Sequence, residues 1–313
     1  MRKTRKRSIF NIVVISTISA VLFLYALTIV SVLLWGLLTS LKSNVDFFIE
    51  SNQVWLPNLD YSRDEVLKLA NYKLIFDNFS FDKSIKFYVG NTPVEHNTSN
   101  NMFTMILNTF LYAGVGSLLQ SLVPAAVAYA CAKFPFKYGK LMYNVALFAM
   151  IVPLVGTYPS EISLFRSIGL YDTFFGYFLQ KFSFGGMYFF VYFAFYQSMP
   201  NTYSEAAEID GASRWKILTS IIIPLSLKMI STVWLIQFVH FWNDYNTALL
   251  YMPTKPTIAY GVYYLCHETA RGRLANVPAK VAACMMLAVP IFILFVFLKD
   301  KLMGNLSSGG TKE

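Results

Sequence analysis

Long apolar runs restrict this chain more than any other feature of its sequence. Ile12 to Leu38 is an almost unbroken apolar segment, and a helix needs roughly 20 such residues to cross a hydrocarbon core of about 30 Å. The run exceeds the roughly 7 to 15 residues of a signal-peptide core, and no convincing small-residue cleavage site follows it. We therefore expect it to remain in the protein as a first membrane span.

Further apolar runs predict an all-α polytopic membrane protein with six transmembrane helices. Composition agrees, because 56% of the residues are hydrophobic and only 14% are charged, against roughly 25% charged residues in soluble domains. Pro153 interrupts the third run, where its missing amide predicts a kink. The expected spans after the first are 103–132, 141–159, 183–199, 217–242 and 277–298.

The distribution of basic residues predicts how the chain is oriented. Much of the net charge of +9 comes from Arg2, Lys3, Arg5, Lys6 and Arg7, which an anionic leaflet explains better than nucleic acid does. By the positive-inside rule we expect both termini in the cytoplasm. The expected parts are a basic tail at 1–11, a first span at 12–38, an extracytoplasmic loop at 39–102, a core of five spans at 103–298 and a C-terminal tail at 299–313.

The segment Glu205 to Pro224 is short and charged, and it separates the fourth and fifth apolar runs. Thr202 and Glu205 stand three residues apart, a spacing typical of a capping box, which predicts a helix that starts near Thr202. Gly211 lets the chain turn with a positive φ after about two helical turns. Because so short a helix is marginal alone in water, we expect something outside the segment to hold it.

One face of this helix combines residues three and four apart, namely Tyr203, Ala206, Ala207 and Asp210. The two alanines leave room there for another backbone to approach closely. Asp210 lies near the C-terminus and opposes the helix macrodipole, so we expect it either to cap a second helix from about Ala212 or to contact a partner. These two roles are compatible, and an ordinary connector is the alternative for the whole segment.

The sequence lacks the motifs of an enzyme or of a metalloprotein. No G-x-x-x-x-G-K-[ST] phosphate loop occurs, so any ATP hydrolysis would take place on another chain. The cysteines and histidines show no metal-ligand spacing, and no cluster of His, Asp or Cys has catalytic spacing. We therefore expect no catalytic residue and no metal site.

Several blocks of sequence match a known family. Its loop pattern of E-A-A, three residues, G, nine residues and I-x-x-P is met by Glu205-Ala206-Ala207, Gly211, Ile221 and Pro224. The other matching blocks are Thr39-Ser40-Leu41-Lys42, Ala128-Tyr129-Ala130, Met150-Ile151-Val152-Pro153, Trp242-Asn243-Asp244 and Gly304 to Gly310. The chain thus resembles the inner-membrane permease subunits of binding-protein-dependent ATP-binding-cassette (ABC) importers, in the carbohydrate branch. It departs from that branch at Lys228, where many members have proline, and in a longer outer loop.

The resemblance implies a type I ABC importer permease fold in a multi-pass protein of the bacterial inner (cytoplasmic) membrane. Its implied partners are a second homologous permease subunit, cytoplasmic ATP-binding subunits and an extracytoplasmic solute-binding protein, in the lipid bilayer and without nucleic acid. No cofactor would be bound by this chain, because ATP and Mg would be held by the partner ATPase. Coupling to that ATPase is expected in a loop at residues 200–216 and nearby, at Glu205, Ala206, Ala207, Asp210, Gly211, Ala212 and Pro224.

The solute expected from this resemblance is an oligosaccharide or another sugar, and a non-sugar polar solute is one alternative. A secondary transporter or channel that works alone is the other, although deep ionisable residues are nearly absent and His240 is the nearest candidate. The fourth run is very rich in aromatic residues, which can stack on sugars but also simply fill membrane cores. Our candidate residues for a substrate pathway are Tyr188, Tyr192, Trp242 and Asn243.

Overall fold

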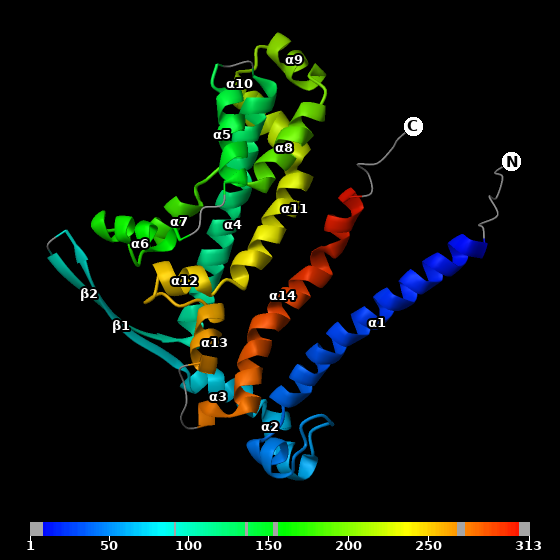
Figure 1. The fold of residues 1–313 in the computed structure, drawn as a ribbon, viewed down its shortest axis with the longest axis vertical. Helices are drawn as coiled ribbons and strands as arrows, with labels where there is room; N and C mark the ends of the chain where they lie inside the picture. Colours follow the sequence, from blue (N-terminus) through cyan, green and yellow to red (C-terminus); the bar gives the residue numbers. More distant parts are fainter. Residues whose placement is uncertain (1–8, 91, 135–136, 153–155, 268–272, 307–313) are drawn as a thin grey trace. The chain divides into compact units, whose positions relative to one another are not determined.

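The computed structural model describes residues 9–90, 92–134, 137–152, 156–267 and 273–306 (Figure 1). The chain divides into two compact units, which are treated separately below. Unit 1 holds the described residues up to Asn78 and those from 273 to Met286, and unit 2 holds Phe79–His267 and the rest. The basic tail at 2–7, the predicted kink at Pro153 and the last residues of the Gly304 to Gly310 block lie outside the described residues.

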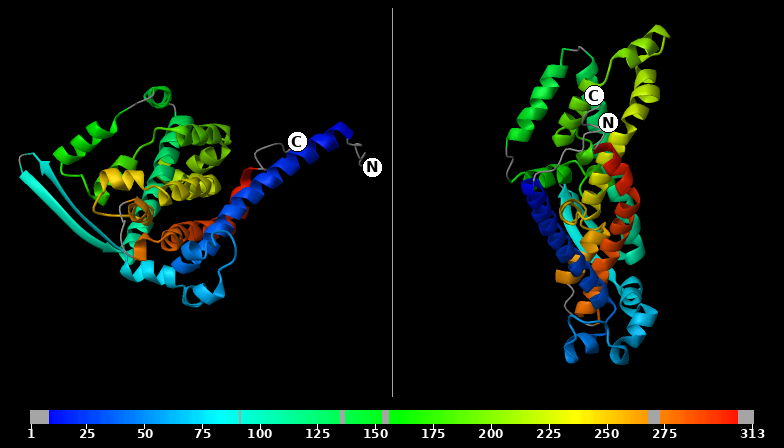
Figure 2. Two further views of the ribbon diagram at one scale, coloured as in Figure 1. Left: turned by 60° about the horizontal axis from the view of Figure 1, so that its bottom comes forward. Right: turned by 90° about the vertical axis from the view of Figure 1, so that its right-hand side faces the viewer.

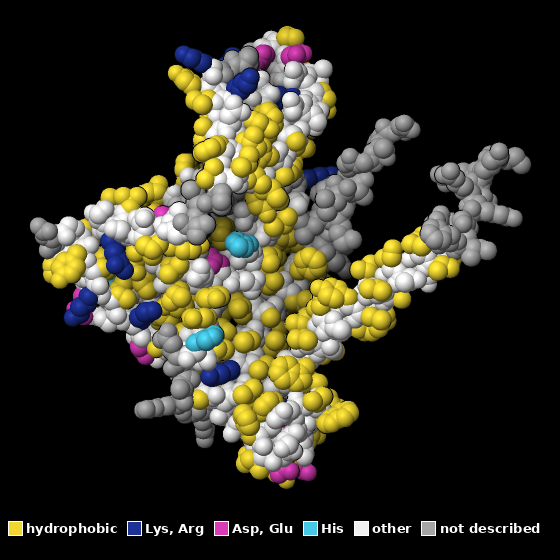
Figure 3. Space-filling model, in the orientation of Figure 1, with side chains coloured by type: hydrophobic (Ala, Val, Ile, Leu, Met, Phe, Trp, Pro, Cys, Tyr) yellow, Lys and Arg dark blue, Asp and Glu magenta, His cyan; other side chains and the backbone are white. Residues whose placement is uncertain are grey.

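Unit 1 contains the first predicted span, helix α1 (Ile9–Ser40). Apolar side chains along most of α1 remain exposed in the protein alone, and Figure 3 shows them on the face in view, which is expected of a helix that faces lipid. Gly36 allows close packing in this unit, since a Cβ there would lie 2.9 Å from Cε of Met285 on α14. The remaining elements of unit 1 are a π-helical turn (Val45–Ile49), α2 (Leu59–Lys68), α3 (Ala70–Asn78), a 3-10 turn (Arg273–Ala275) and the first part of α14 (Val277–Leu306).

A buried polar cluster organises the chain that follows α1. The carboxylate of Asp46 is fully buried and accepts hydrogen bonds from Asn52 Nδ2 at 2.8 Å, the Asn58 amide at 2.9 Å and Ser62 Oγ at 2.6 Å. Lys42 is also buried and donates from Nζ to the Asn52 carbonyl at 2.6 Å, and burial lowers the pKa of Lys42. The segment after α1 is therefore a folded cap held by polar contacts.

Unit 2 is a helical bundle in which α8 (Met187–Ser198) and α11 (Ile223–Trp242) pack along α4 (Met102–Lys133) (Figures 1 and 2). Small residues on α4 meet aromatic and branched residues on the other helices, which lets the backbones approach closely as membrane helices do. The members of this core include Ala125, Ala128, Tyr129, Phe189, Tyr192, Tyr196, Ile230 and Val233. The shorter helices of unit 2 are α5 (Gly139–Ile151), α6 (Tyr158–Ser167), α7 (Phe174–Lys181), α9 (Thr202–Ile209), α10 (Arg214–Ile217), α12 (Asn246–Tyr251) and α13 (Ile258–His267).

A two-stranded antiparallel hairpin corrects the all-α prediction. Strands β1 (Ser80–Val89) and β2 (Thr92–Asn101) pair along their whole length, and β2 runs directly into α4 (Figure 1). Apolar Phe81 and Phe87 are buried on one face of β1. Between them every second residue is exposed on the other face, which is the two-residue period of a strand. Phe81 packs edge-on against Tyr260 of α13 with ring centroids 4.9 Å apart, so the hairpin is fastened to the bundle.

Four of the described helical segments are long and apolar enough to cross a membrane, by length and composition. They are Ile12–Ser40, Met102–Lys133, Arg214–Trp242 and Val277–Leu298, and they match the predicted first, second, fifth and sixth spans. The predicted third and fourth spans coincide with α5 and α8, which have 13 and 12 residues. At 1.5 Å per residue such helices are about 20 Å long and fall short of a hydrocarbon core, so the count of six is not confirmed.

Candidate functional site

Helix α9 lies within the loop between α8 and α11, and it begins at Thr202 as the sequence predicts. The predicted capping box is wrong. Asn201 precedes the helix in a helical conformation, with φ −74° and ψ −17°, and its carbonyl accepts from the amides of Ser204 and Glu205 at 3.0 Å each. Thr202 is therefore the first residue of the helix and not its N-cap, and the amide of Glu205 bonds to the Asn201 carbonyl instead of the Thr202 hydroxyl.

The turn after α9 follows one prediction and contradicts another. Gly211 has φ +78°, the left-handed conformation that its position in the sequence predicts. The second helix is capped not by Asp210 but by Ser213, whose Oγ accepts from the Lys216 amide at 3.3 Å. Asp210 instead ends α9 with an exposed side chain, which leaves only its predicted role toward a partner.

The two alanines of α9 face in different directions. Ala207 is 8% exposed and belongs to the same buried cluster as Tyr129 and Ile217, whereas Ala206 is exposed. Ala207 therefore packs inside this chain, and only Ala206 leaves room for a partner. Glu205, Gly211 and Pro224 are exposed, and Ala212 is half-buried.

Large apolar side chains project from this otherwise polar loop. Ile209 is 86% exposed, Trp215 72% and Tyr203 49%, although Lys, Arg, Asp and Glu side chains surround them at this end of the bundle (Figure 3). Exposed apolar groups rimmed by charged residues mark surfaces that bind another protein. We call Tyr203, Ile209 and Trp215 the apolar triad of the loop.

Lys133, the last residue of α4, holds the start of α9 in place. Its Nζ donates to Asn201 Oδ1 at 2.7 Å and to the Met199 carbonyl. Arg214 on the other side of the loop lies with its guanidinium 5.2 Å from the ring centroid of Phe134, at the end of the same helix. A cavity of about 250 Å³ remains between these contacts, lined among others by Glu205 and Lys133. The loop is thus fixed to the bundle by contacts that do not use its exposed triad.

The connection from α10 to α11 includes a π-helical turn, Leu218–Ile222. The amide of Ile223 donates to the carbonyl of Leu218, five residues earlier, and Pro224 follows at the start of α11. Pro224 has no backbone N–H, so one α-helical hydrogen bond is absent at this position, and a π-helical turn next to it is compatible with that loss.

The predicted substrate-pathway residues fall into two separate clusters. Tyr192 is fully buried in the α4–α8–α11 core and Tyr188 packs against the same core, four residues earlier on α8. Trp242 is buried elsewhere, against Phe110 at 5.3 Å between ring centroids, and its Nε1 donates to the Leu287 carbonyl at 3.1 Å. Asn243 is exposed and donates from Nδ2 to the Val239 carbonyl at 2.9 Å. The four residues therefore do not line one common surface.

A buried polar cluster that was not predicted from the sequence lies beside Trp242. Tyr112 of α4 donates from its hydroxyl to Asp244 Oδ2 at 2.6 Å, and its ring stacks on Tyr177 of α7 with centroids 4.1 Å apart. Lys181 Nζ lies 5.3 Å from the Tyr177 centroid. Asp244 stands within the matching Trp242-Asn243-Asp244 block, so a signal was present, but its partners, more than 60 residues away, are not visible in the sequence.

The part of the chain that the structure describes contains no cluster of side chains suited to bind a metal ion. There, no group of three or more His, Cys, Asp or Glu side chains lies close enough to hold a metal ion.

The chain belongs to the family described as binding-protein-dependent transport system inner membrane component, whose pattern matches residues 122–307. This confirms the resemblance drawn from the sequence blocks. The matched range contains α8, the whole α9–α10 loop and α11, which are the elements described above.

Individual relatives agree with this assignment. The melibiose/raffinose/stachyose import permease protein MelC of Bacillus subtilis is 28% identical over 239 residues, 74% of this chain and 83% of that protein. The maltose/maltodextrin transport system permease protein MalG of Vibrio vulnificus is 27% identical over 221 residues, 67% of this chain and 73% of that protein.

A solved structure has the same fold. The crystal structure of a bacterial ABC transporter involved in the import of the acidic polysaccharide alginate contains a chain that superposes with a TM-score of 0.70 over 95% of this chain and 99% of that chain. Sequence identity is 18%, so this likeness establishes the fold of an ABC importer permease.

Proposed function

We propose that this chain is the transmembrane permease subunit of an ATP-driven, binding-protein-dependent importer of an oligosaccharide or another sugar. The observation that carries the proposal is the α9–α10 loop, which is fixed to its own bundle through Ala207 and Lys133 while the apolar triad stays exposed. A surface of this kind suits a separate protein that closes against it. Tyr203 and Ile209 are unsuited to lipid, because Glu205, Glu208 and Asp210 lie on the same short helix and its C-terminal cap. Trp215 lies between Arg214 and Lys216 on α10, which is equally unsuited to lipid.

The partner at this loop is proposed to be a cytoplasmic ATPase subunit, which would hold ATP and Mg. Glu205 and Asp210 are exposed on α9 and available for polar contacts with that subunit. A second homologous permease and an extracytoplasmic solute-binding protein complete the proposed assembly. A second solved structure with a similar chain supports a binding protein of this kind, since it is a bacterial alginate ABC transporter in complex with an alginate pentasaccharide-bound periplasmic protein.

The proposed topology has six spans with both termini in the cytoplasm of a bacterium. The four long apolar helices account for four crossings, and α5 and α8 are proposed to complete the others with their flanking residues. Lys133, Lys137 and Lys140 between α4 and α5, and Arg214 and Lys216 in the loop, place basic residues on the proposed inner side.

The solute class is proposed from the relatives, whose names describe the import of melibiose, raffinose, stachyose and maltodextrin. A non-sugar polar solute remains the alternative within the same class of importer. An independent secondary transporter is the alternative outside it, and solute uptake by this chain alone in liposomes would establish that alternative.

The test combines substitutions in the loop with assays of the assembled complex. Gly211→Pro removes the left-handed turn, because proline fixes φ near −65°, and Glu205→Ala removes an exposed carboxylate of α9. We expect both variants to insert into the membrane but to lose solute uptake and solute-stimulated ATP hydrolysis. Normal stimulated hydrolysis in both variants would overturn the coupling role of the loop.

A second measurement addresses the partner directly. Ile209→Ser and Trp215→Ser should reduce copurification of the ATPase subunit with this chain, because each removes a large exposed apolar side chain. Phe175→Ser on α7 is the matched control, since Phe175 is 67% exposed but lies outside the loop. Equal recovery of the ATPase with all three variants would contradict the proposed interface.

A further inference from the structure

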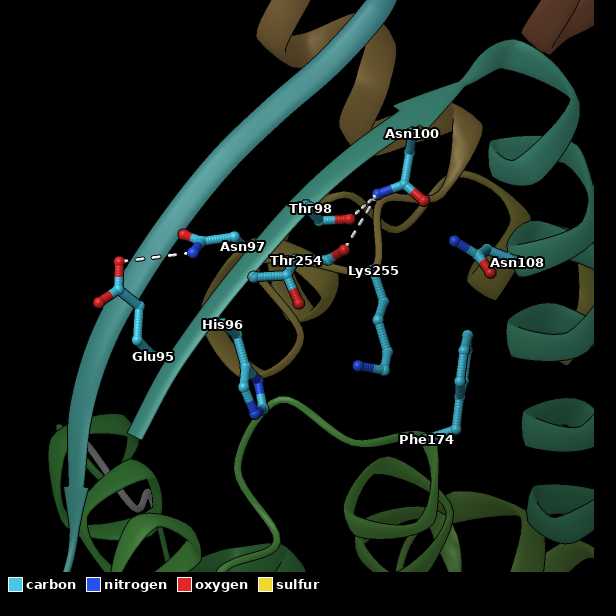
Figure 4. Close-up of a pocket in the computed structure, with 9 residues that line it drawn as sticks. All are labelled: Glu95, His96, Asn97, Thr98, Asn100, Asn108, Phe174, Thr254 and Lys255. Atoms are coloured by element: carbon cyan, nitrogen blue, oxygen red, sulfur yellow. Dashed lines mark hydrogen bonds between the residues drawn. The ribbon is translucent and has the colours of Figure 1, made fainter. Parts of the chain in front are cut away.

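A polar pocket of about 450 Å³ lies away from the coupling loop, where the hairpin, the first turns of α4, the start of α7 and the chain after α12 meet (Figure 4). Its volume falls within the roughly 300 to 1,000 Å³ of small-molecule sites. All its lining residues belong to unit 2. Figure 4 shows Lys255 extending into the pocket, with His96 on one side and Phe174 on the other.

Asp172 fixes the walls of this pocket. It is fully buried and has φ 61°, a conformation that residues other than glycine rarely adopt. Its carboxylate accepts from the Thr254 amide at 3.0 Å and from the Thr254 hydroxyl, and it lies 2.6 Å from Nδ1 of His96 on β2. One side chain thus joins the hairpin, the segment before α7 and the segment after α12. The pocket is therefore formed before any ligand arrives, which reduces the cost of ordering it on binding.

Several polar side chains in the pocket keep atoms that can form hydrogen bonds with a ligand. The ammonium of Lys255 lies 4.0 Å from Asp172 Oδ2 and has no hydrogen-bond acceptor among the described residues. Asn108 of α4 donates from Nδ2 to the Pro256 carbonyl at 3.0 Å, which leaves its own carbonyl oxygen as an acceptor. His96 contacts Asp172 through Nδ1, and its Nε2 atom makes no hydrogen bond within the described chain. Donors and acceptors are thus available side by side.

The pocket also offers an apolar surface in Phe174, the first residue of α7. A sugar ring presents hydroxyl groups at its rim, which both donate and accept, and C–H groups on its faces, which pack on aromatic rings. The combination of Lys255, Asn108 and Phe174 fits this pattern better than it fits a purely charged or a purely apolar ligand.

The charges around the pocket favour a neutral ligand over an acidic one. Lys255 already faces the buried carboxylate of Asp172, and Glu95 at the rim is paired with Lys86 at 3.1 Å. A ligand carboxylate bound to Lys255 would therefore sit close to Asp172 and be repelled by it.

We infer that this pocket binds one ring of a neutral sugar. The inference rests on the proposed function for its biological meaning, in which the ring belongs to the imported solute at the outer mouth of the permease. The chemistry of the site stands on the contacts described above, and it can be tested without transport.

The experiment measures sugar binding to the full chain in lipid nanodiscs, without ATPase or solute-binding protein. Saturation-transfer NMR with maltotriose, raffinose and cellotriose as neutral probes, and trigalacturonate as the anionic probe, gives binding curves. At least one neutral trisaccharide should bind saturably and more tightly than trigalacturonate. Phe174→Leu should weaken that binding about three- to tenfold. Phe174→Tyr should preserve it, because the tyrosine ring can stack on a sugar as the phenylalanine ring does. Lys255→Met should weaken it by a similar factor, whereas Lys140→Met, at an exposed position of α5 outside the pocket, should leave it unchanged.

The inference would be overturned by no saturable binding of any neutral trisaccharide, by stronger binding of trigalacturonate, or by binding that is indifferent to both Phe174→Leu and Lys255→Met. Binding that appears only when the solute-binding protein is added would also overturn it and would mark the pocket as a protein contact. Failure of the proposed function looks different. In that case ATP-driven uptake by the complex is absent, while trisaccharide binding and its dependence on Phe174 persist.

Discussion

Lys133 provides a direct test of how the coupling loop is held. Its ammonium donates to Asn201 Oδ1 at 2.7 Å and to the Met199 carbonyl, and both acceptors immediately precede α9. Lys133→Met keeps the length and apolar stem of the side chain but removes both hydrogen bonds. We expect α9 to remain helical when docked but to leave the bundle more often.

The size of the effect follows from the kind of bond that is lost. Hydrogen bonds from a charged donor contribute about 1.5 to 3 kcal/mol each, and the partial exposure of Lys133 places both near or below the lower end. A combined loss of about 2 to 3 kcal/mol raises the undocked fraction of the loop about 30- to 150-fold.

Hydrogen exchange of the complex in nanodiscs measures this fraction. The reporters are the amides of Asp210 and Ala212, which donate within the loop to the carbonyls of Ala206 at 3.1 Å and Ala207 at 2.9 Å. Their exchange should accelerate by about the same 30- to 150-fold factor, and solute-stimulated ATP hydrolysis should fall. Lys140→Met is the matched control, because Lys140 is exposed on α5. Exchange in Lys133→Met within about threefold of the unsubstituted protein would refute the reasoning.

Three further predictions concern other parts of the chain. Ala207→Leu should overpack the core and lower the free energy of unfolding by about 1 to 3 kcal/mol, whereas Ala206→Leu should leave thermal stability unchanged and weaken ATPase copurification; equal melting temperatures would contradict this difference. Asp46→Ala should remove the acceptor shared by Asn52, Asn58 and the buried Ser62 hydroxyl, costing about 1 to 3 kcal/mol, and make the segment after α1 sensitive to protease; unchanged cleavage would count against the cap. Hydrogen bonds from Ser99 and Ser80 lower the pKa of Asp82, so the hairpin should be stabilised above about pH 4 and lose that contribution as pH falls further; hydrogen exchange across this range should show the loss, and Ser99→Ala should reduce it.

The α9 helix shows how far local sequence rules reach. Its start at Thr202 and the left-handed turn at Gly211 were predicted correctly, because both depend on neighbouring residues. The capping box failed because Asn201 takes a helical conformation ahead of Thr202, and the side chain of Asn201 is held by Lys133, 68 positions away in the sequence. The opposite orientations of Ala206 and Ala207 also depend on packing against distant helices and were not visible in the periodicity.

The same distinction explains the rest of the fold. Four long apolar helices were predicted because length and hydrophobicity suffice to identify them. The strands were missed because the ten residues Ser80–Val89, whose burial alternates, were treated as part of a mixed polar loop. Asp172 and Asp244 escaped notice because each is defined by partners from distant segments, Thr254 and Tyr112, that only the folded chain brings together.

The π-helical turn at Leu218–Ile222 has a consequence for how a push on the loop would travel. This turn holds one residue more than an α-helical turn, and the surplus residue is bordered by Pro224, which cannot take up the missing hydrogen bond. If this turn tightened to an α-helical one, everything before it would rotate by about 100° around the axis of α11 and shift by about 1.5 Å along it, since an α-helix turns through 360° in 3.6 residues and rises about 1.5 Å per residue. At this joint between loop and span, a small displacement of the loop along the axis of α11 is therefore coupled to a large rotation around that axis.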